Sequence, residues 1–301
     1  MNIVVVGGAG FIGSHLVDRL LAEGHSVDVI DDLSVGSLAN LADARASGGA
    51  LKIHHLDAAS AEADSLIGMR RPEVIYQLGL LPRHERSARA QGRVFSLALG
   101  TLEAARKHGV GKVVVALPAS ALYGQPTVQS LPVKEGDLTP RGVRGVVARS
   151  IVDLLSTYRE QYSVEFTALA LATVYGPRQI PGSGVVATFH EAALTSTPPV
   201  FDGDGRQTRD LLYIDDAVDA LVRASERGSG LVINIGTGEQ TSIRDLWEHL
   251  DPGGTVEPTL RPERPDEIAR FAVSPVRARI HLAWSPWTDL ETGLTRLRNR
   301  P

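Results

Sequence analysis

Three glycines near the amino terminus have the spacing and the setting of a dinucleotide-binding turn. An apolar run over residues 3–6 leads into Gly-x-x-Gly-x-x-Gly at residues 7–13, and a helical pattern follows over 12–23. Such a turn lets the backbone approach a pyrophosphate, whose charge then lies at the positive end of the helix. A strand before the turn and a helix after it are the context that the motif requires. The residues predicted to hold the cofactor are Gly7, Gly10, Phe11, Ile12 and Gly13.

Acidic residues follow the next two apolar runs. Asp31 and Asp32 close the run 27–30, and Asp57 follows the run 51–55. A carboxylate about 20 residues after the turn accepts hydrogen bonds from the adenosine ribose and repels a 2′-phosphate, which predicts NAD rather than NADP. Asp57 is expected near the adenine, with a strand-end cap as the alternative. For Asp31 the alternative is a solvated loop acid.

The elements that must position these residues alternate along the chain. Short apolar runs are separated by amphipathic stretches, which is typical of βαβ units. After about residue 172 the alternation weakens, and proline, glycine and arginine become frequent. We expect an α/β, Rossmann-type doubly wound parallel sheet (1–173 plus about 208–236) and a smaller C-terminal substrate-binding lobe (about 174–207 plus 237–301). Strands are expected at 3–6, 27–30, 51–55, 73–78, 112–117 and 165–171, and helices at 12–23, 61–70, 93–108 and 145–162.

Composition excludes several classes of function. The chain has 301 residues and a formal net charge of −4, which disfavours nucleic acid or an anionic membrane as the main partner. It contains no cysteine, so thiol nucleophiles and Cys-ligated metals are excluded. His54, His55 and His190 lack metal-ligand spacing, and no metal site is expected.

No apolar run approaches the ~20 residues that span a bilayer. The first strand begins so early that no leader is expected, and the expected compartment is the cytoplasm.

Several motifs together resemble one family. Residues 7–36 and the later motifs are similar to the extended short-chain dehydrogenase/reductases, specifically the NAD-dependent nucleotide-sugar epimerase/dehydratase branch that includes UDP-glucose 4-epimerase. The resemblance covers nearly the whole chain. The later motifs are Leu122-Tyr123-Gly124, Tyr175-Gly176-Pro177-Arg178-Gln179, Arg209-Asp210-Leu211-Leu212-Tyr213 and Asn234-Ile235-Gly236-Thr237-Gly238.

The resemblance implies that the second lobe binds a nucleotide diphosphate sugar, such as a UDP- or dTDP-sugar. Arg209 falls on the family's diphosphate-contacting arginine, and Arg264 on a second arginine near the nucleotide. The planar guanidinium suits this task because it pairs with two phosphate oxygens and keeps its charge. Thr173 stands where many members carry an asparagine that contacts the diphosphate. The alternatives are an internal ion pair of Arg209 with Asp210 or Asp215, and a solvated loop position for Arg264.

The family's proton relay is missing from its expected positions. In the family a serine or threonine, a tyrosine and a lysine one turn further on form this relay. Alignment on residues 123–124 and 139–140 places Ala119, Arg144 and Ala148 at these positions, with Val94 at a supporting asparagine. None of the six tyrosines has a lysine four residues later. Arg144 cannot serve as a base at neutral pH, and Ala148 carries no charge.

Three functions therefore remain open. The missing relay favours an NAD-binding, nucleotide-sugar epimerase/dehydratase-like protein that is non-catalytic or atypical. The alternative is an active NAD-dependent epimerase, dehydratase or oxidoreductase with replacement acid/base residues, for which His84, Ser120 and Tyr123 are weak candidates. A third possibility is an interaction protein in which even the NAD site is vestigial. Because relatives dimerise through the helices that match 93–108 and 145–162, a homodimer is expected.

Overall fold

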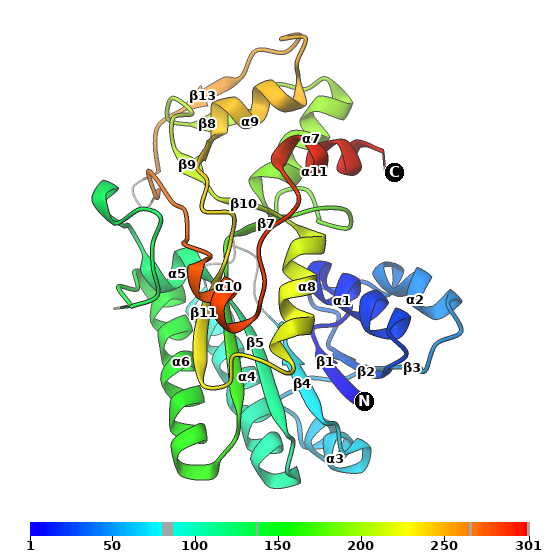
Figure 1. The fold of residues 1–301 in the computed structure, drawn as a ribbon. Coiled ribbons are helices and arrows are strands. Elements are labelled where there is room, and N and C mark those ends of the chain that lie inside the picture. The colour runs from blue at the N-terminus through cyan, green and yellow to red at the C-terminus, as the bar shows by residue number, and fades with distance from the viewer. Residues whose placement is uncertain (80–86, 137, 265–266, 300–301) are drawn as a thin grey trace.

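A seven-stranded parallel sheet forms the centre of the computed structural model, which describes residues 1–79, 87–136, 138–264 and 267–299 (Figure 1). The strand order is β3-β2-β1-β4-β5-β6-β11, and every neighbouring pair is parallel. The order reverses between β1 and β4, where doubly wound folds bind their ligands. All six expected strands are confirmed, and β11 is an additional one. The strands are β1 (Asn2–Val6), β2 (Ser26–Asp31), β3 (Leu51–His55), β4 (Val74–Gln77), β5 (Lys112–Pro118), β6 (Phe166–Leu171) and β11 (Leu231–Ile235).

Helices cover both faces of this sheet, as its apolar strands require. Within β1, Ile3 and Val5 point into one core and Val4 and Val6 into the other. The first core is closed by α1 and α8, and the second by α3, α4 and α6. The helices are α1 (Phe11–Ala22), α2 (Ala42–Ala46) after the short 3-10 helix η1 (Leu38–Leu41), α3 (Ala61–Arg70), α4 (Ala88–His108), α5 (Ala119–Tyr123), α6 (Gly142–Tyr162) and α8 (Ile214–Ala224).

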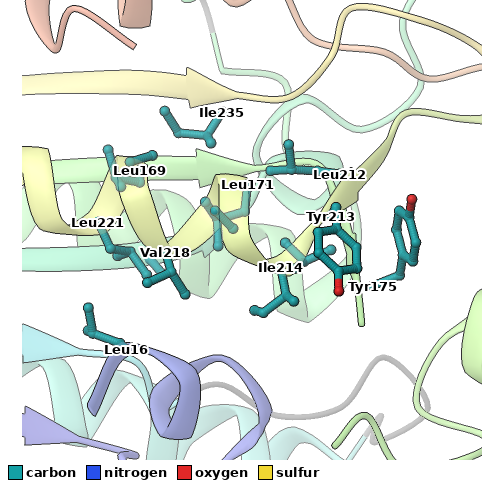
Figure 2. Close-up of a cluster of buried hydrophobic side chains, with 14 of the residues drawn as sticks. Leu16, Leu169, Leu171, Tyr175, Leu212, Tyr213, Ile214, Val218, Leu221 and Ile235 are labelled. Atoms are coloured by element: carbon teal, nitrogen blue, oxygen red, sulfur yellow. The ribbon is translucent and has the colours of Figure 1, made fainter. Parts of the chain in front are cut away.

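The helix α8 packs beside α1 on one face of the sheet. Its side chains Val218 and Leu221 lie between Leu169 of β6 and Leu16 of α1 (Figure 2). These residues are almost completely buried. Segments that are far apart in the sequence therefore share this core.

Two of the expected helices begin earlier than their periodicity indicates. Helix α4 begins at Ala88, because the Ser87 hydroxyl accepts a hydrogen bond from the N–H of Ala90 (3.1 Å) and caps the first turn. Helix α6 begins at Gly142. Both changes extend the helices at their N-terminal ends, on the side of the sheet where the strands have their carboxyl ends.

Small sheets and helices gather above the carboxyl ends of the central strands, at the top of Figure 1. Phe189 stacks on Phe201 with ring centroids 5.4 Å apart, and Trp247 packs edge-on against Phe189 at 5.7 Å. The division of the chain into two domains stays a prediction. No helix in the described ranges is long and apolar enough to cross a membrane. The elements of this region are β7 (Thr173–Tyr175), α7 (Val185–Thr195), β8 (Val200–Asp202), β9 (Thr208–Arg209), β10 (Leu211–Tyr213), β12 (Thr241–Ser242), α9 (Ile243–Leu250), β13 (Thr259–Arg261) and α11 (Leu290–Arg298). Helix α10 (Val276–His281) instead packs beside the edge strand β11.

Candidate functional site

The glycine turn lies between β1 and α1, where the sequence predicts it. Gly7 has a φ of +77°, and a Cβ there would lie 2.9 Å from the backbone nitrogen of Gly79. A Cβ at Gly13 would lie only 2.1 Å from the carbonyl oxygen of Gly7, so glycine permits the close approach of helix and strand. Gly10 precedes α1, and among the described residues no side chain caps this helix end. The first-turn N–H groups around Phe11 and Ile12 therefore fit a pyrophosphate.

Asp31 lies at the end of β2 and connects it to the turn. Its side chain is buried (8% exposed), and its two oxygens accept hydrogen bonds from the N–H groups of Ala9 (2.9 Å) and Leu33 (2.8 Å). Burial raises the pKa of Asp31, and these hydrogen bonds oppose that effect. A carboxylate oxygen has two acceptor sites, so each oxygen can still accept a ribose hydroxyl.

A bridging arginine joins the other two predicted cofactor acids. Arg93 of α4 lies 2.7 Å from the Asp32 carboxylate and 3.5 Å from that of Asp57. Although burial raises the pKa of Asp32, hydrogen bonds from Ser34 and the charge of Arg93 bring it below its ordinary value. The Asp57 carboxylate also accepts the N–H of Ala59 (2.9 Å), as a strand-end cap does. The sequence did not single out Arg93, because its partners are distant along the chain.

The positions of the family's relay meet between β5, α4 and α6. Ala119 and Ala148 are buried, and so is Val94. Val94, Arg144 and Ala148 line a cavity of about 20 Å³ together with Gln91, Leu117, Pro118, Val147 and Ile151. The lining is mostly apolar, and a cavity of this volume has room for about one water molecule. This region therefore gives little solvation to a charged group.

The candidates for a replacement base are placed differently. The Tyr123 phenol is buried and donates a hydrogen bond to the amide oxygen of Asn234 (2.7 Å). Burial raises the pKa of Tyr123, which disfavours it as a base. Ser120 is half-buried in α5. His84 lies outside the described residues.

Arg209 is held inside the lobe by several contacts. Its side chain is 6% exposed, donates to the carbonyl oxygens of Thr208 and Ile268 (both 2.7 Å), and pairs with the Glu267 carboxylate. An internal ion pair, the alternative considered from the sequence, is therefore present, but its partner is Glu267. Both charges are buried, so the pair fixes the position of the guanidinium.

A buried carboxylate next to Arg209 ties three segments of the lobe together. Asp210 accepts hydrogen bonds from the hydroxyl (2.7 Å) and the N–H (2.8 Å) of Thr237, and from the N–H groups of Gly238 and Val273 (both 3.1 Å). Burial raises the pKa of Asp210, and these hydrogen bonds counteract it. The sequence motifs contained Asp210 but did not indicate this role, since its partners come from another motif.

The remaining lobe candidates are Thr173 on β7 and Arg264, which follows β13. Thr173 is half-buried in β7, and its N–H donates to the carbonyl oxygen of Asp210 (2.9 Å). Arg264 is half exposed and pairs with the Asp202 carboxylate at the end of β8. The ion pair with Asp202 therefore holds the Arg264 guanidinium within the lobe, where the sequence predicts a contact with the nucleotide.

The histidines have other partners. His54 contacts the Asp28 carboxylate (2.7 Å), and the His55 ring lies 3.1 Å from the carbonyl oxygen of Asp32. Burial lowers the pKa of His190. Within the described ranges, no three or more His, Asp or Glu side chains group so that they could hold a metal ion.

A comparison with known protein families shows which family shares this sheet and this glycine turn. A model described as the NAD dependent epimerase/dehydratase family matches residues 3–236, a span that includes the sheet, the glycine turn and the relay positions. The chain belongs to this family. Because the family is NAD-dependent, NAD is confirmed as the predicted cofactor, and the open end of α1 and the Asp31 carboxylate fit it.

Curated relatives and solved structures of this family match along the full chain. The chain is 39% identical to a UDP-glucose 4-epimerase of Mycolicibacterium smegmatis, over 98% of this chain and 97% of that protein. The structure of a Thermotoga maritima UDP-glucose 4-epimerase with UDP-glucose superposes with a TM-score of 0.91 at 34% identity, covering 99% of this chain and 97% of the other. A Thermus thermophilus UDP-glucose 4-epimerase in complex with NAD gives 0.87 at 27% identity, with both chains fully covered.

Proposed function

We propose that this chain binds NAD at the glycine turn and a nucleotide diphosphate sugar in the C-terminal lobe, without the family's serine–tyrosine–lysine relay. The sheet domain would comprise 1–173 and about 208–236, and the lobe about 174–207 and 237–301. A UDP-sugar is the favoured ligand because the relatives include enzymes named for UDP-glucose. The protein would then be a non-catalytic or atypical member of its family, acting in the cytoplasm.

The surroundings of Ala148 are the observation that carries this proposal. The side chain is 4% exposed and shares its small cavity with Val94 and Ile151. In the family a lysine is expected here, and its ammonium lowers the pKa of the neighbouring tyrosine. With alanine at this position and Arg144 at that of the tyrosine, the described residues provide neither a phenolate nor the cation that stabilises one.

The residues for ligand binding remain in place. NAD, when bound, supplies a hydride acceptor. Gly10 and the first turn of α1 would hold its pyrophosphate, and Asp31 its adenosine ribose. Arg209, Arg264 and Thr173 are proposed to contact the nucleotide diphosphate. The ion pair with Glu267 would orient Arg209 for this contact, because it removes the rotational freedom of a long side chain.

An active enzyme with a replacement base is the second candidate. The observation that favours it is the 39% identity over 98% of the chain to a protein named UDP-glucose 4-epimerase. Ser120 and His84 are then the side chains to examine first, since the phenol of Tyr123 is engaged with Asn234.

A comparison of ligand binding with catalytic turnover distinguishes the non-catalytic protein from the active enzyme. The purified protein is titrated with NAD and UDP-glucose by calorimetry. It is then incubated with both ligands, while reduced nicotinamide is followed by absorbance and the sugar products by chromatography. The Mycolicibacterium smegmatis relative serves as the positive control. We expect binding of both ligands without conversion to UDP-galactose; sustained conversion would support the second candidate.

A homodimer through α4 and α6 is also proposed. The two helices pack side by side on one face of the sheet (Figure 1). Their exposed apolar side chains include Leu99, Val143, Val146 and Tyr162. Burial of such side chains against a second copy is favourable. Sedimentation equilibrium of the wild-type protein and of Val146→Glu tests this arrangement, because a buried glutamate should dissociate the dimer.

A further inference from the structure

Arg178 combines an unfavourable backbone conformation with a network of contacts. It follows β7 in the loop that leads to α7, and its φ is +66°. This left-handed conformation is disfavoured for residues other than glycine, asparagine and aspartate. Such a conformation persists where the surrounding structure compensates for it, and it points to a functional constraint.

The guanidinium of Arg178 connects two helices of the cofactor region. It lies 2.7 Å from the Asp18 carboxylate on α1 and 2.9 Å from the Asp43 carboxylate on α2. The side chain of Arg178 is 19% exposed, whereas that of Asp43 is 84% exposed. The contact with Asp18 is therefore the stronger one, since ion pairs in water contribute little. The preceding residue adds a third contact, because the ring of His15 on α1 lies 3.0 Å from the carbonyl oxygen of Pro177.

Both helices lead directly to the glycine turn. On α1, the ring of His15 packs edge-on against Phe11, the residue that follows Gly10 (centroids 5.9 Å apart). Just before α2, the amide of Asn40 and the N–H of Ser37 donate to the carbonyl oxygen of Ala9 (2.9 and 3.0 Å). Ala9 and Phe11, which flank Gly10 in the turn, are thus connected to the segment that leads into α2 and to α1, respectively.

Arg178 itself lies away from the turn. With His15, Asp18 and Asp43 it lines an open cleft of about 910 Å³, whose described lining includes no residue of the glycine turn. An effect of Arg178 on the cofactor would therefore pass through α1 and α2.

We infer that Arg178 is a positioning residue for NAD: by joining Asp18 to Asp43 it fixes the spacing between α1, which follows the pyrophosphate turn, and α2, whose preceding segment holds Ala9 of that turn. The unfavourable φ is compensated by these contacts. The cofactor's adenosine and pyrophosphate half should depend on this arrangement, because that half is expected at the turn. The inference depends on NAD binding and not on the loss of the catalytic relay.

Arg178→Asn separates this role from a purely structural one. Asparagine tolerates the left-handed conformation but cannot reach both carboxylates. We expect the Kd for NAD and the Kd for ADP-ribose to rise by the same factor, on the order of tenfold, as for other substitutions behind a binding site. The melting temperature of the cofactor-free protein should stay the same or rise. The matched control is Arg159→Asn, which removes an exposed ion pair with Glu165 (3.2 Å) near the C-terminal end of α6. The Kd values of this control for NAD and ADP-ribose should not change.

Single substitutions of the two carboxylates provide a second test. Asp18→Asn should reproduce most of the loss in NAD affinity, and Asp43→Asn a smaller but measurable part of it, because either substitution opens the bridge and the Asp43 contact is the more exposed one. This series remains informative if Arg178→Asn fails to fold. Unchanged NAD affinity in both Arg178→Asn and Asp18→Asn would overturn the inference. Losses of affinity that simply follow losses of melting temperature across all the variants would also overturn it.

Discussion

The backbone N–H of Ala9 donates a 2.9 Å hydrogen bond to the carboxylate of Asp31. Ala9 lies within the glycine turn, so the acid proposed to contact the adenosine ribose also holds the turn against the end of β2. Because Leu33 donates to the other oxygen, the carboxylate is fixed before any ligand arrives. A substitution of Asp31 should therefore change the shape of the turn and the selectivity of the pocket together.

The first prediction concerns the choice between NAD and NADP. The wild-type protein should bind NAD more tightly than NADP in calorimetric titrations, because a carboxylate at Asp31 repels the 2′-phosphate. Asp31→Ala should reduce the difference between the affinities for NAD and NADP. It should also lower the free energy of unfolding by about 1–3 kcal/mol, because the N–H of Ala9 loses its acceptor. The control is Glu165→Ala, which removes an exposed carboxylate paired with Arg159 and should leave the preference unchanged. Equal wild-type affinities for NAD and NADP would refute the role of Asp31.

The second prediction concerns Arg209 and its ion pair with Glu267. Arg209→Met should lower the free energy of unfolding by about 3–5 kcal/mol, because it leaves the Glu267 carboxylate buried without this partner. It should also weaken UDP binding by roughly 10- to 150-fold, the value of one charged hydrogen bond. Denaturant unfolding and calorimetry measure the two effects.

The double variant Arg209→Met/Glu267→Gln separates these effects. Stability should largely recover in it, because neither member of the former ion pair is charged, while UDP affinity should stay low. Recovery of both quantities would show that Arg209 stabilises the lobe and does not contact the nucleotide.

The third prediction is that the relay can be rebuilt only as a unit. Arg144→Tyr alone should not give epimerase activity, because a phenol with a pKa of about 10 is less than 1% ionised at pH 7. Ala148→Lys alone should destabilise the protein, because its ammonium would enter the apolar cavity beside Val94. Val94→Asn should restore part of the lost stability, because its amide oxygen can accept a hydrogen bond from the lysine ammonium.

Activity should therefore appear only when these three changes are combined with Ala119→Ser, a strongly non-additive outcome. The measurement is conversion of UDP-glucose to UDP-galactose, resolved by chromatography. Comparable turnover by the unmutated protein would contradict the proposed absence of the relay. His84→Ala, Ser120→Ala and Tyr123→Phe would then identify the replacement base.

The fourth prediction concerns a pH-dependent loss of stability. Burial raises the pKa of Asp216 from its ordinary value of 3.8 to about 6, although Thr288 donates to it through its N–H (3.1 Å) and its hydroxyl (3.2 Å). The folded protein thus binds this proton more tightly than the unfolded chain does. The stabilisation is fully present below about pH 4 and is lost as the pH rises through about 6.

Asp216→Asn should abolish this dependence. The difference in free energy of unfolding between wild type and variant should fall by roughly 2 kcal/mol between about pH 4 and pH 7. Urea titrations at several pH values measure it. The control is Glu226→Gln, because that carboxylate is exposed just beyond the C-terminal end of α8 and is not among the groups that shift the pKa of Asp216. A pH-independent difference for Asp216→Asn would contradict the assignment.

Local patterns predicted the fold better than the contacts of the site. The strands of the sheet and the helices around it follow from apolar periodicity, which depends on neighbours in the sequence. The early start of α4 depends on the Ser87 cap, a signal that periodicity does not contain. Strand β11 lies within the segment expected to return to the sheet, but its short apolar run did not identify it as a strand.

Long-range polar partners could not be predicted. Arg93 joins Asp32 to Asp57, and Arg209 pairs with Glu267, in each case across segments that no local pattern relates. The glycine turn was predictable because its chemistry is contained within seven successive residues, 7–13. The arrangement at Arg178 was not, because it depends on a backbone angle and on two separate helices.

The packing of α1 against α8 has a consequence for biosynthesis. Leu16 and Val17 lie in the first helix to leave the ribosome, yet Val218 and Leu221, which cover that face, are made much later. Until then, apolar surface on the nascent chain stays uncovered, and such surface attracts chaperones and promotes aggregation. A product that terminates before α8 should therefore accumulate as insoluble material, even though it contains the whole glycine turn.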